Sequence, residues 1–327
     1  MAVDVSSAPR LVADIGGTNA RFALVGAEEL PRDERVLPGA DYPDIVSAIE
    51  AYLGQVGGPR PREAAFAIAN PITGDWVKMT NHTWEFSIEE TRKRLGLEQL
   101  VLINDFTAQA MSLPWLTPSD LHQVGGGRPV ERGAIGVLGA GTGLGVSGLI
   151  HAGDHWIPLQ GEGGHVSLSP ASAREVAILE VSWRRFEHVS AERLVSGMGL
   201  QNLHHAVSVL EGREPEPLSP AQISERALSA ADPICAEALE TFCGMLGTVA
   251  GNLALTLGAT GGIYLGGGIV PRLGSYFDDS LFRQRFEAKG RFAGYLAAVP
   301  TWVIRAQHPA LIGVSKVFGP YRSVFGR

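Results

Sequence analysis

Cysteine is scarce in this chain of 327 residues, which contains only Cys235 and Cys243. The two lie eight positions apart in a helix-like run, which is too far for a disulfide. No zinc cluster can be built from them with local ligand spacing. We therefore interpret both as reduced thiols of the core, as is usual in a cytosolic protein.

Long apolar runs are also absent. The sequence has no stretch of about 18 apolar residues, and its first ten residues, MAVDVSSAPR, hold no apolar signal core. The most apolar region, from Ile234 to Gly258, is broken by Glu237 and Glu240, so we expect a buried helix of a soluble protein. These absences predict a cytoplasmic location and no membrane partner.

Positive charge is in deficit, since the formal net charge is −7. A protein that holds the phosphate backbone of a nucleic acid is usually basic, so that class of partner is disfavoured. A phosphate-loop lysine is missing too, because no lysine follows a glycine loop of the form GxxxxGKS or GxxxxGKT. If this chain binds a nucleotide, it uses backbone N–H groups, hydroxyls and a metal.

The residues that are present favour an α/β protein of two ordinary domains or one large one. Hydrophobic residues make up 45% of the chain, enough for a sizeable core. Buried strands are predicted at 64–70 and 100–103, with helices near 43–55 and 88–95, an alternation typical of an α/β sheet. The rest of the chain adds helical regions at 171–209, interrupted near Gly197 and Gly199, and at 220–258, then a strand entering glycines within 261–273, a strand at 301–306 and a helix at 309–318.

The run LVADIGGTNARFAL within residues 11–25 predicts a strand, a tight glycine turn and a second strand. Gly16, Gly17 and Thr18 in the turn can bring backbone N–H groups and a hydroxyl against an anion. Asp14, at the end of the first strand, can face a metal or its water shell. This hairpin is therefore a candidate phosphate-binding turn.

A second hairpin, AIGVLGAGTGLGVSGLI, spans residues 134–150. A shift of 124 positions places Gly17-Thr18 on Gly141-Thr142 and Asp14 on Leu138, so only one of the two turns carries the carboxylate. We interpret this as an internal duplication that yields two similar domains facing each other across a cleft. The GxGxxG match at 143–148 does not indicate a dinucleotide fold, because a strand pattern, and not a helix, follows it.

Asn104 and Asp105 follow an apolar strand and precede a helix pattern. Ligands of open α/β sheets bind beyond such strand ends, so Asp105 is a candidate acceptor of a hydroxyl proton in phosphoryl transfer. The alternative, that Asp105 is only a helix N-cap, is equally compatible with the residues.

Glu162 and His165 lie among glycines in GEGGH, at residues 161–165. Glycine permits close backbone approach, and an acid and a histidine can bracket the hydroxyls of a polyol. Taken alone, the motif fits a surface turn somewhat better, and Glu192 in HVSAERLVSG fits a charge on a helix surface.

Seven motifs in the same order make most of the chain resemble the bacterial glucokinases, of the proteobacterial and cyanobacterial type, within the hexokinase–Hsp70–actin superfamily. The motifs are ADIGGTNARFAL, NPITGDWVKMTNHTW, LINDFTAQA, LGAGTGLGVSGLI, GEGGHVSLSP, HVSAERLVSGMGL and GGIYLGGGIVPR. The resemblance implies two ribonuclease H-like domains of the actin-like ATPase and hexokinase fold, with residues 1–112 plus 308–327 in a small α/β domain and 113–307 in a large one. It also implies a homodimer.

The resemblance further implies a transfer of the γ-phosphoryl group of ATP to the 6-hydroxyl of glucose, with Mg²⁺ held by Asp14 through water and Asp105 as the general base. The residues implied for glucose are Asn104, Asp105, Glu162, His165 and Glu192. Those implied for ATP are Ala13, Asp14, Ile15, Gly16, Gly17, Thr18, Gly141, Thr142, Gly143, Gly266, Gly267 and Gly268.

Alternatives stay open at the level of sequence. The chain is compatible with a kinase for another hexose or an amino sugar, and with a non-catalytic sugar- or nucleotide-sensing module of the same fold. The glycine turns do not distinguish ATP from ADP or polyphosphate as the donor. The Cys-rich zinc motif and the N-terminal DNA-binding helix pair of related repressors are not found in the sequence.

Overall fold

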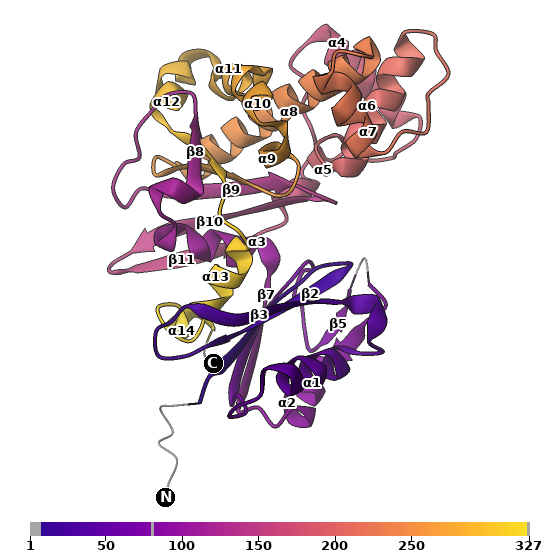
Figure 1. The fold of residues 1–327 in the computed structure, drawn as a ribbon. Coiled ribbons are helices and arrows are strands. Elements are labelled where there is room, and N and C mark those ends of the chain that lie inside the picture. The colour runs from indigo at the N-terminus through magenta and orange to yellow at the C-terminus, as the bar shows by residue number, and fades with distance from the viewer. Residues whose placement is uncertain (1–7, 80–81, 326–327) are drawn as a thin grey trace, which may run out of the picture. The chain divides into compact units, whose positions relative to one another are not determined.

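The computed structural model describes residues 8–79 and 82–325. The chain divides into two compact units (Figure 1). The first comprises Met1–Thr117, His151–Gln160 and Ala306–Arg327, and the second Pro118–Ile150 and Gly161–Arg305. Residues 113–117, 151–160 and 306–307, which the sequence analysis assigned to the larger domain, therefore lie in the first unit.

The first unit is built on a five-stranded sheet of order β3-β2-β1-β4-β7. β2 pairs antiparallel with both β1 and β3, whereas β1, β4 and β7 run parallel to one another. The strands are β1 (Arg10–Ile15), β2 (Asn19–Val25), β3 (Pro31–Pro38), β4 (Glu63–Ile68) and β7 (Gln99–Asn104), and a separate pair is formed by β5 (Trp76–Lys78) and β6 (Glu85–Ser87).

Alternation along β1 sends its side chains into two cores. Leu11, Ala13 and Ile15 join a cluster with α1 (Ile45–Val56), whereas Val12 joins one with α3 (Asp105–Ser112) and α13 (Pro309–Ser315). Figure 1 shows α1 and α2 (Ile88–Arg94) together on one side of the sheet. The first unit therefore has the layered form, helices on both faces of a sheet, that the strand and helix pattern predicts.

Close packing of α3 and α13 depends on one glycine. A Cβ atom added at Gly313 would lie 1.7 Å from the carbonyl oxygen of Ala108, so no larger residue fits there without moving the helices apart. Tyr321 joins the same cluster and donates to the carbonyl of Met111 at 3.3 Å.

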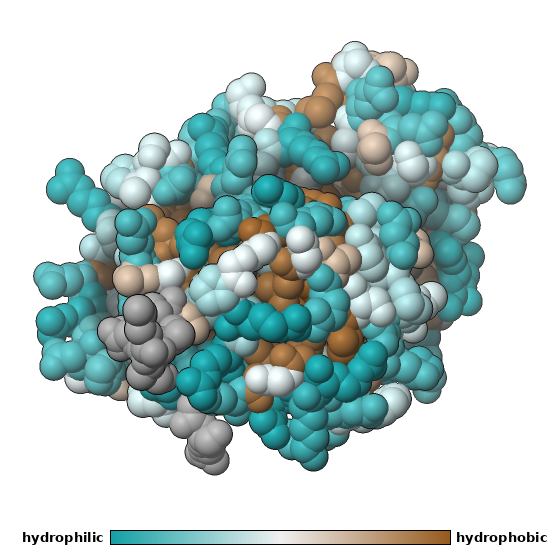
Figure 2. All heavy atoms as spheres, turned by 60° about the horizontal axis from the view of Figure 1, so that its bottom comes forward, coloured by the Kyte–Doolittle hydropathy of each residue, from teal (hydrophilic) through white to brown (hydrophobic). Residues whose placement is uncertain are grey.

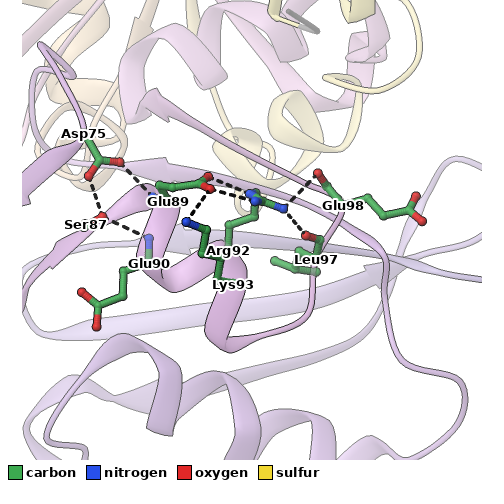
Figure 3. Close-up of polar contacts among 8 residues, drawn as sticks. All are labelled: Asp75, Ser87, Glu89, Glu90, Arg92, Lys93, Leu97 and Glu98. Atoms are coloured by element: carbon green, nitrogen blue, oxygen red, sulfur yellow. Dashed lines mark hydrogen bonds and ion pairs between the residues drawn. The ribbon is translucent and has the colours of Figure 1, made fainter.

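Polar side chains fix the beginning of α2, as Figure 3 shows. The hydroxyl of Ser87 accepts from the amide of Glu90 at 3.0 Å and donates to Asp75 at 2.5 Å, and Asp75 also accepts from the amide of Glu89 at 2.9 Å. Arg92 then forms a two-pronged ion pair with Glu89, at 2.7 and 2.8 Å. Asp75 of the NPITGD motif thus has a structural role in anchoring this helix.

The second unit repeats the strand plan of the first. β9 (Ile135–Ala140) and β10 (Leu144–Ala152) form an antiparallel hairpin, and β9, β12 (Gly262–Gly266) and β13 (Thr301–Ile304) run parallel. β8 (Leu121–Val124) adds an antiparallel strand beside β13. A hairpin followed by two parallel strands occurs in both units, as a duplication predicts, whereas β11 (His155–Gln160) falls in the first unit.

The longest described helix, α8 (Pro233–Leu257), occupies the core of the second unit and packs against α6 (Gly197–Leu210), α7 (Pro220–Leu228) and α11 (Leu281–Glu287). Within the described part of the chain it alone is long and apolar enough to cross a membrane, but 72% of its most apolar window is buried inside the protein. Its two cysteines are buried free thiols, in agreement with the sequence interpretation.

Two predicted helical regions are divided more finely than expected. Region 220–258 breaks at 229–232, because Asp232 caps the start of α8 and Pro233 follows it. The helices of this unit are α4 (Ala173–Trp183), α5 (Ala191–Leu194), α6 (Gly197–Leu210), α7 (Pro220–Leu228), α9 (Val270–Leu273), α10 (Ser275–Asp279), α11 (Leu281–Glu287) and α12 (Ala293–Ala298). The remaining short elements of the two units are α14 (Arg322–Phe325) and the 3₁₀ turns Gly39–Asp41, Leu113–Trp115, Pro118–Asp120, Gly163–His165 and Gly290–Phe292.

Hydrophilic side chains cover most of the face drawn in Figure 2, and hydrophobic ones show between them in separate patches. The bulk of the apolar side chains is instead gathered in three buried clusters, one in the second unit and two in the first. The chain therefore forms the sizeable core that its composition predicts.

Candidate functional site

Strand register brings two predicted motifs to the same edge of the first sheet. Ile15 pairs with Ile68, and Ile68 with Asn104, so the carboxyl ends of β1, β4 and β7 are level. The turn after β1 and the Asn104-Asp105 pair after β7 therefore share the edge at which α/β sheets bind ligands.

The turn between β1 and β2 leaves donors available for an anion. The Gly16 amide donates to the carbonyl of Asn19 at 3.0 Å, and the Thr18 carbonyl accepts from the amide of Gly39 at 2.9 Å. Among the described residues the amides of Gly17 and Thr18 have no such acceptor, and Thr18 is exposed. Backbone N–H groups in this arrangement suit a phosphate.

Asp14 lies in a charged group that the sequence analysis did not identify. Its carboxylate accepts from the Arg21 guanidinium at 3.0 Å, and Glu34 lies 3.1 Å from Nε of Arg21 and 3.4 Å from Nε2 of His308. Burial nevertheless raises the pKa of Asp14, against the opposing effect of Arg21. The carboxylate is short of solvation, which a nearby cation would relieve.

Arg21 could have been found from the sequence, because the symmetric register of a hairpin places it directly opposite Asp14. Glu34 and His308 had no such signal. β3, which carries Glu34, is charged and mostly exposed, and His308 lies in a distant loop where it adopts a left-handed φ of 52°. Tertiary folding alone brings these two residues together.

Asn104, and not Asp105, is the N-cap of α3. Its side-chain oxygen accepts from the amides of Phe106 and Thr107, at 2.9 and 3.2 Å. Asp105 is the first helical residue, and its carboxylate accepts from Phe106 at 2.9 Å. The interpretation of Asp105 as only an N-cap is therefore wrong, since the neighbouring residue performs that role.

The second unit presents an equivalent edge. The Gly141 amide donates to the Gly143 carbonyl, and the Gly141 carbonyl accepts from the amide of Gly197 at the start of α6, both at 2.8 Å. Thr142 in this turn is exposed. The turn is thus held against a helix start while Thr142 remains exposed.

Gly266, Gly267 and Gly268 follow β12 beside this turn, because Gly266 pairs with Gly139 on β9. Gly267 has a left-handed φ of 78°, and a Cβ atom there would lie 2.3 Å from the carbonyl oxygen of Ala140. These glycines let two strand ends approach closely, and the space around Gly268 is open.

Glu192 lies on α5 and is bonded to the second hairpin, so the interpretation of it as only a charge on a helix surface is wrong. Its carboxylate accepts from the amide of Leu144 at 2.8 Å. A Cβ atom at Gly143 would lie 2.4 Å from the same carboxylate, which explains the glycine at this position. The short helix α5 thus delivers an acid to the first residue of β10.

The GEGGH segment is held against the same strand. A Cβ atom at Gly164 would lie 2.0 Å from the carbonyl oxygen of Leu144, so only glycine permits this approach. Glu162 and His165 lie 3.9 Å apart, with side chains 53% and 60% exposed. Both side chains are accessible to a ligand, while the segment that carries them is packed more tightly than an incidental surface turn requires.

Comparison with known proteins gives one consistent result. A family model described as Glucokinase matches residues 11–319. The chain is 54% identical over 307 residues to a glucokinase of Neisseria meningitidis, covering 94% of each chain, and 53% identical over 309 residues to one of Aromatoleum aromaticum, covering 94% of this chain and 93% of that one.

Solved structures agree with this result. A glucokinase from an Antarctic psychrotroph has a TM-score of 0.85 and 36% identity, with 94% of this chain and 97% of that chain covered. A ROK family glucokinase from Streptomyces griseus, solved with glucose and AMPPNP, has a TM-score of 0.63 and 17% identity, with 94% and 98% covered, and shows similarity of fold alone.

Proposed function

The chain belongs to the glucokinase family, and from this premise we propose that it transfers the γ-phosphoryl group of ATP to the 6-hydroxyl of glucose with Asp105 as the general base. Glucose kinase activity follows from the family, and the roles of individual residues are our proposal. The observation that carries it is the level edge of the first sheet, where the Asp14 turn and Asp105 lie together.

Asp105 suits the role of base by its position. It follows a buried strand and begins a helix whose N-cap is already supplied by Asn104, so the carboxylate is not needed for capping. A sugar hydroxyl is a poor nucleophile, and a carboxylate within reach can orient it and accept its proton late in the transfer.

Asp14 fits a magnesium ion bound through water. Its carboxylate is a hard oxygen donor, and burial raises its pKa, which supports a role for a compensating cation beside it. Bound Mg²⁺ supplies neutralisation of the charge that develops on the phosphoryl oxygens. Arg21 holds the carboxylate in place at the turn, at 3.0 Å.

The two glycine turns suit the phosphates of the nucleotide. Gly17 and Thr18 offer amides in the first unit, and Gly141, Thr142 and Gly143 form the corresponding turn in the second. We assign Gly266, Gly267 and Gly268 to the adenosine, supported by the open space around Gly268. Catalysis of phosphoryl transfer rests mainly on such positioning and charge stabilisation.

For the sugar we propose Asn104 and Asp105 in the first unit and Glu162, His165 and Glu192 in the second. The last three are supported by their convergence on the start of β10, where Leu144 contacts both Glu192 and the GEGGH segment. An acid and a histidine with exposed side chains can accept and donate hydrogen bonds to hydroxyls.

Initial-rate kinetics with glucose, mannose, fructose and N-acetylglucosamine, each with ATP and Mg²⁺, test the proposed function. We expect the highest kcat/KM with glucose. A higher value for another sugar would make the chain a kinase for that sugar. Sugar binding in calorimetry without ATP turnover would instead indicate a sensing module.

The donor is tested by replacing ATP with ADP or polyphosphate in the same assay, and we expect turnover with ATP. We also propose a cytoplasmic homodimer, which the family resemblance supports. Analytical ultracentrifugation of the purified chain tests this, and a single species of monomer mass at micromolar concentration would contradict it.

A further inference from the structure

Three side chains that can bind a metal converge in the second unit, away from the residues proposed for catalysis. His204 lies on α6, Asp232 precedes α8, and Cys235 lies in the first turn of α8. Their donor atoms, one nitrogen, one oxygen and one sulfur, all lie within 4.8 Å of one another. We call these residues the His204 cluster.

Within the described residues, the imidazole of His204 has charged neighbours, Asp232 among them, but no hydrogen-bond partner. His204 is only 4% exposed. Within the described ranges its ring takes part in no hydrogen bond, ion pair or aromatic contact. Its backbone carbonyl accepts a hydrogen bond from the hydroxyl of Ser208. The ring nitrogens are not among the fully buried polar atoms that lack a partner in the described residues, so the ring stays open to water or to a ligand. The residue lines a cavity of about 380 Å³, which provides a route of entry.

The carboxylate of Asp232 already has several partners, among them the thiol of Cys235, which donates to it. Oδ1 accepts from the amides of Ile234 and Cys235 at 2.8 and 3.3 Å, as an N-cap does, whereas Oδ2 faces Nη1 of Arg226 at 3.8 Å. Arg226 is itself paired with Glu216 at 2.9 Å, so its charge is shared between two carboxylates. Beside the cluster, the two carboxylates Asp232 and Glu216 therefore face one guanidinium, Arg226, while Arg185 and Arg193 line the cavity.

We propose that His204, Asp232 and Cys235 bind a divalent ion of the zinc class, with water from the cavity as fourth ligand. Nitrogen, sulfur and carboxylate oxygen are the donors that Zn²⁺ takes in four-coordinate sites, at about 2.0–2.3 Å. Donors around such an ion lie roughly 3–4 Å apart, so small side-chain rotations close the cluster. Binding forms a bond between the metal and the thiolate sulfur and releases the thiol proton to water.

Titration of the chelator-treated full-length chain with Co²⁺ alone tests this proposal. A cobalt ion bound to a thiolate gives an intense near-ultraviolet charge-transfer band that oxygen and nitrogen ligands do not give. The chain has only two cysteines, so the band can come from Cys235 or Cys243 and from no other residue. Magnesium sites formed by carboxylates stay silent in this readout.

Cys243→Ser is the matched control for Cys235→Ser, because both are buried thiols of α8 and only Cys235 belongs to the cluster. We expect a band that saturates at one cobalt per chain, persists in Cys243→Ser and disappears in Cys235→Ser. His204→Gln should weaken cobalt binding by roughly tenfold or more. Zn²⁺ should abolish the band in the wild type by displacement.

Asp232→Asn covers the case in which the cysteine variant fails to fold, because asparagine is as good an N-cap as aspartate and removes only the charge. It should weaken cobalt binding while the far-ultraviolet circular dichroism stays that of the wild type. Absence of a thiolate band in the wild type, or a band that survives in Cys235→Ser, would overturn the site and leave Asp232 as a helix cap alone.

Discussion

Two roles were considered for the Asp105 carboxylate, that of a general base and that of a helix cap. The neighbouring Asn104 caps α3, so loss of the Asp105 carboxylate should leave the helix intact. We expect Asp105→Ala to lower kcat by at least about 10²–10⁴-fold, the usual contribution of a general base. Coupled-assay kinetics measure this.

Calorimetry with glucose supplies the control for Asp105→Ala, because some sugar binding should remain when the base is lost. A variant with nearly wild-type kcat would remove Asp105 from the mechanism. A variant that neither binds glucose nor melts cooperatively would show that the residue supports the fold instead.

Burial of the ionised Asp14 carboxylate lowers the stability of the folded chain at neutral pH. Its pKa is raised in the folded chain, chiefly by burial, so the folded state binds its proton more tightly than the unfolded state does. The contribution of this group to stability is therefore present below the ordinary pKa of 3.8 and lost as pH rises through the raised value. We expect Asp14→Asn to melt above the wild type at pH 7, with the difference shrinking toward pH 4, and to lose turnover.

The pKa of Asp44 is shifted in the opposite direction, so this residue serves as the control. Burial alone would raise its pKa, but hydrogen bonds from Ser47 and the ion pair with Arg94 lower it overall. Its stabilisation is present above the ordinary pKa and lost as pH falls through the lowered one, so Asp44→Asn should melt below the wild type at pH 7. Thermal melts of both variants between pH 4 and 7 measure this. A lower melting temperature for Asp14→Asn at pH 7 would contradict the cost assigned to its burial.

At the scale of elements, the turn between β9 and β10 offers a paired test in which two glycines differ in surroundings. A Cβ atom at Gly143 would meet Glu192 at 2.4 Å, whereas nothing lies within 4 Å of one at Gly141. Gly143→Ala should displace Glu192 from the Leu144 amide. Since a hydrogen bond to a charged group is worth about 1.5–3 kcal/mol, we expect KM for glucose to rise about tenfold or more.

Gly141→Ala keeps the amide and has room for its methyl group, so its KM for glucose should stay close to that of the wild type. Steady-state kinetics at saturating ATP compare the two variants. Equal effects of both substitutions would mean that the turn, and not the position of Glu192, governs sugar binding.

Helices and strands whose residues carry a clear local pattern could be predicted from the sequence, and those without such a pattern could not. Both glycine hairpins, β4, β7 and α2 are found where the apolar pattern indicates them. β3 was missed because its sequence, PRDERVLP, is charged and mostly exposed, as suits an outer strand of the sheet. β5, β6 and β8 were missed because three or four residues carry too little pattern.

The residues of the candidate site divide in the same way, into those with a local sequence signal and those without one. Asp14, Asp105 and the glycine turns stand beside strands whose pattern is local, so sequence alone placed them at strand ends. The contact between Glu192 and Leu144 joins residues 48 positions apart, and the group around Asp14 includes His308 from the far end of the chain. No local pattern encodes such pairings, which arise from packing of elements distant in sequence.

For the whole molecule, the two units share a strand plan, but β1 carries the carboxylate of Asp14 where β9 has Leu138. If Asp14 holds the metal as proposed, that role is confined to the first unit, and the single substitution Asp14→Asn should separate the response to ATP with magnesium from the response to glucose. A ligand present at a hundred times its Kd stabilises the folded state by about 2.7 kcal/mol. We expect glucose at that excess to raise the melting temperature of the wild type and of Asp14→Asn alike. Magnesium and ATP should raise the melting temperature of the wild type alone, because the variant lacks the carboxylate proposed to hold the ion.

Differential scanning fluorimetry with each substrate separately measures these melting temperatures, with ATP in the presence of a chelator as the control. Equal stabilisation of both proteins by magnesium and ATP would place the metal site elsewhere than Asp14.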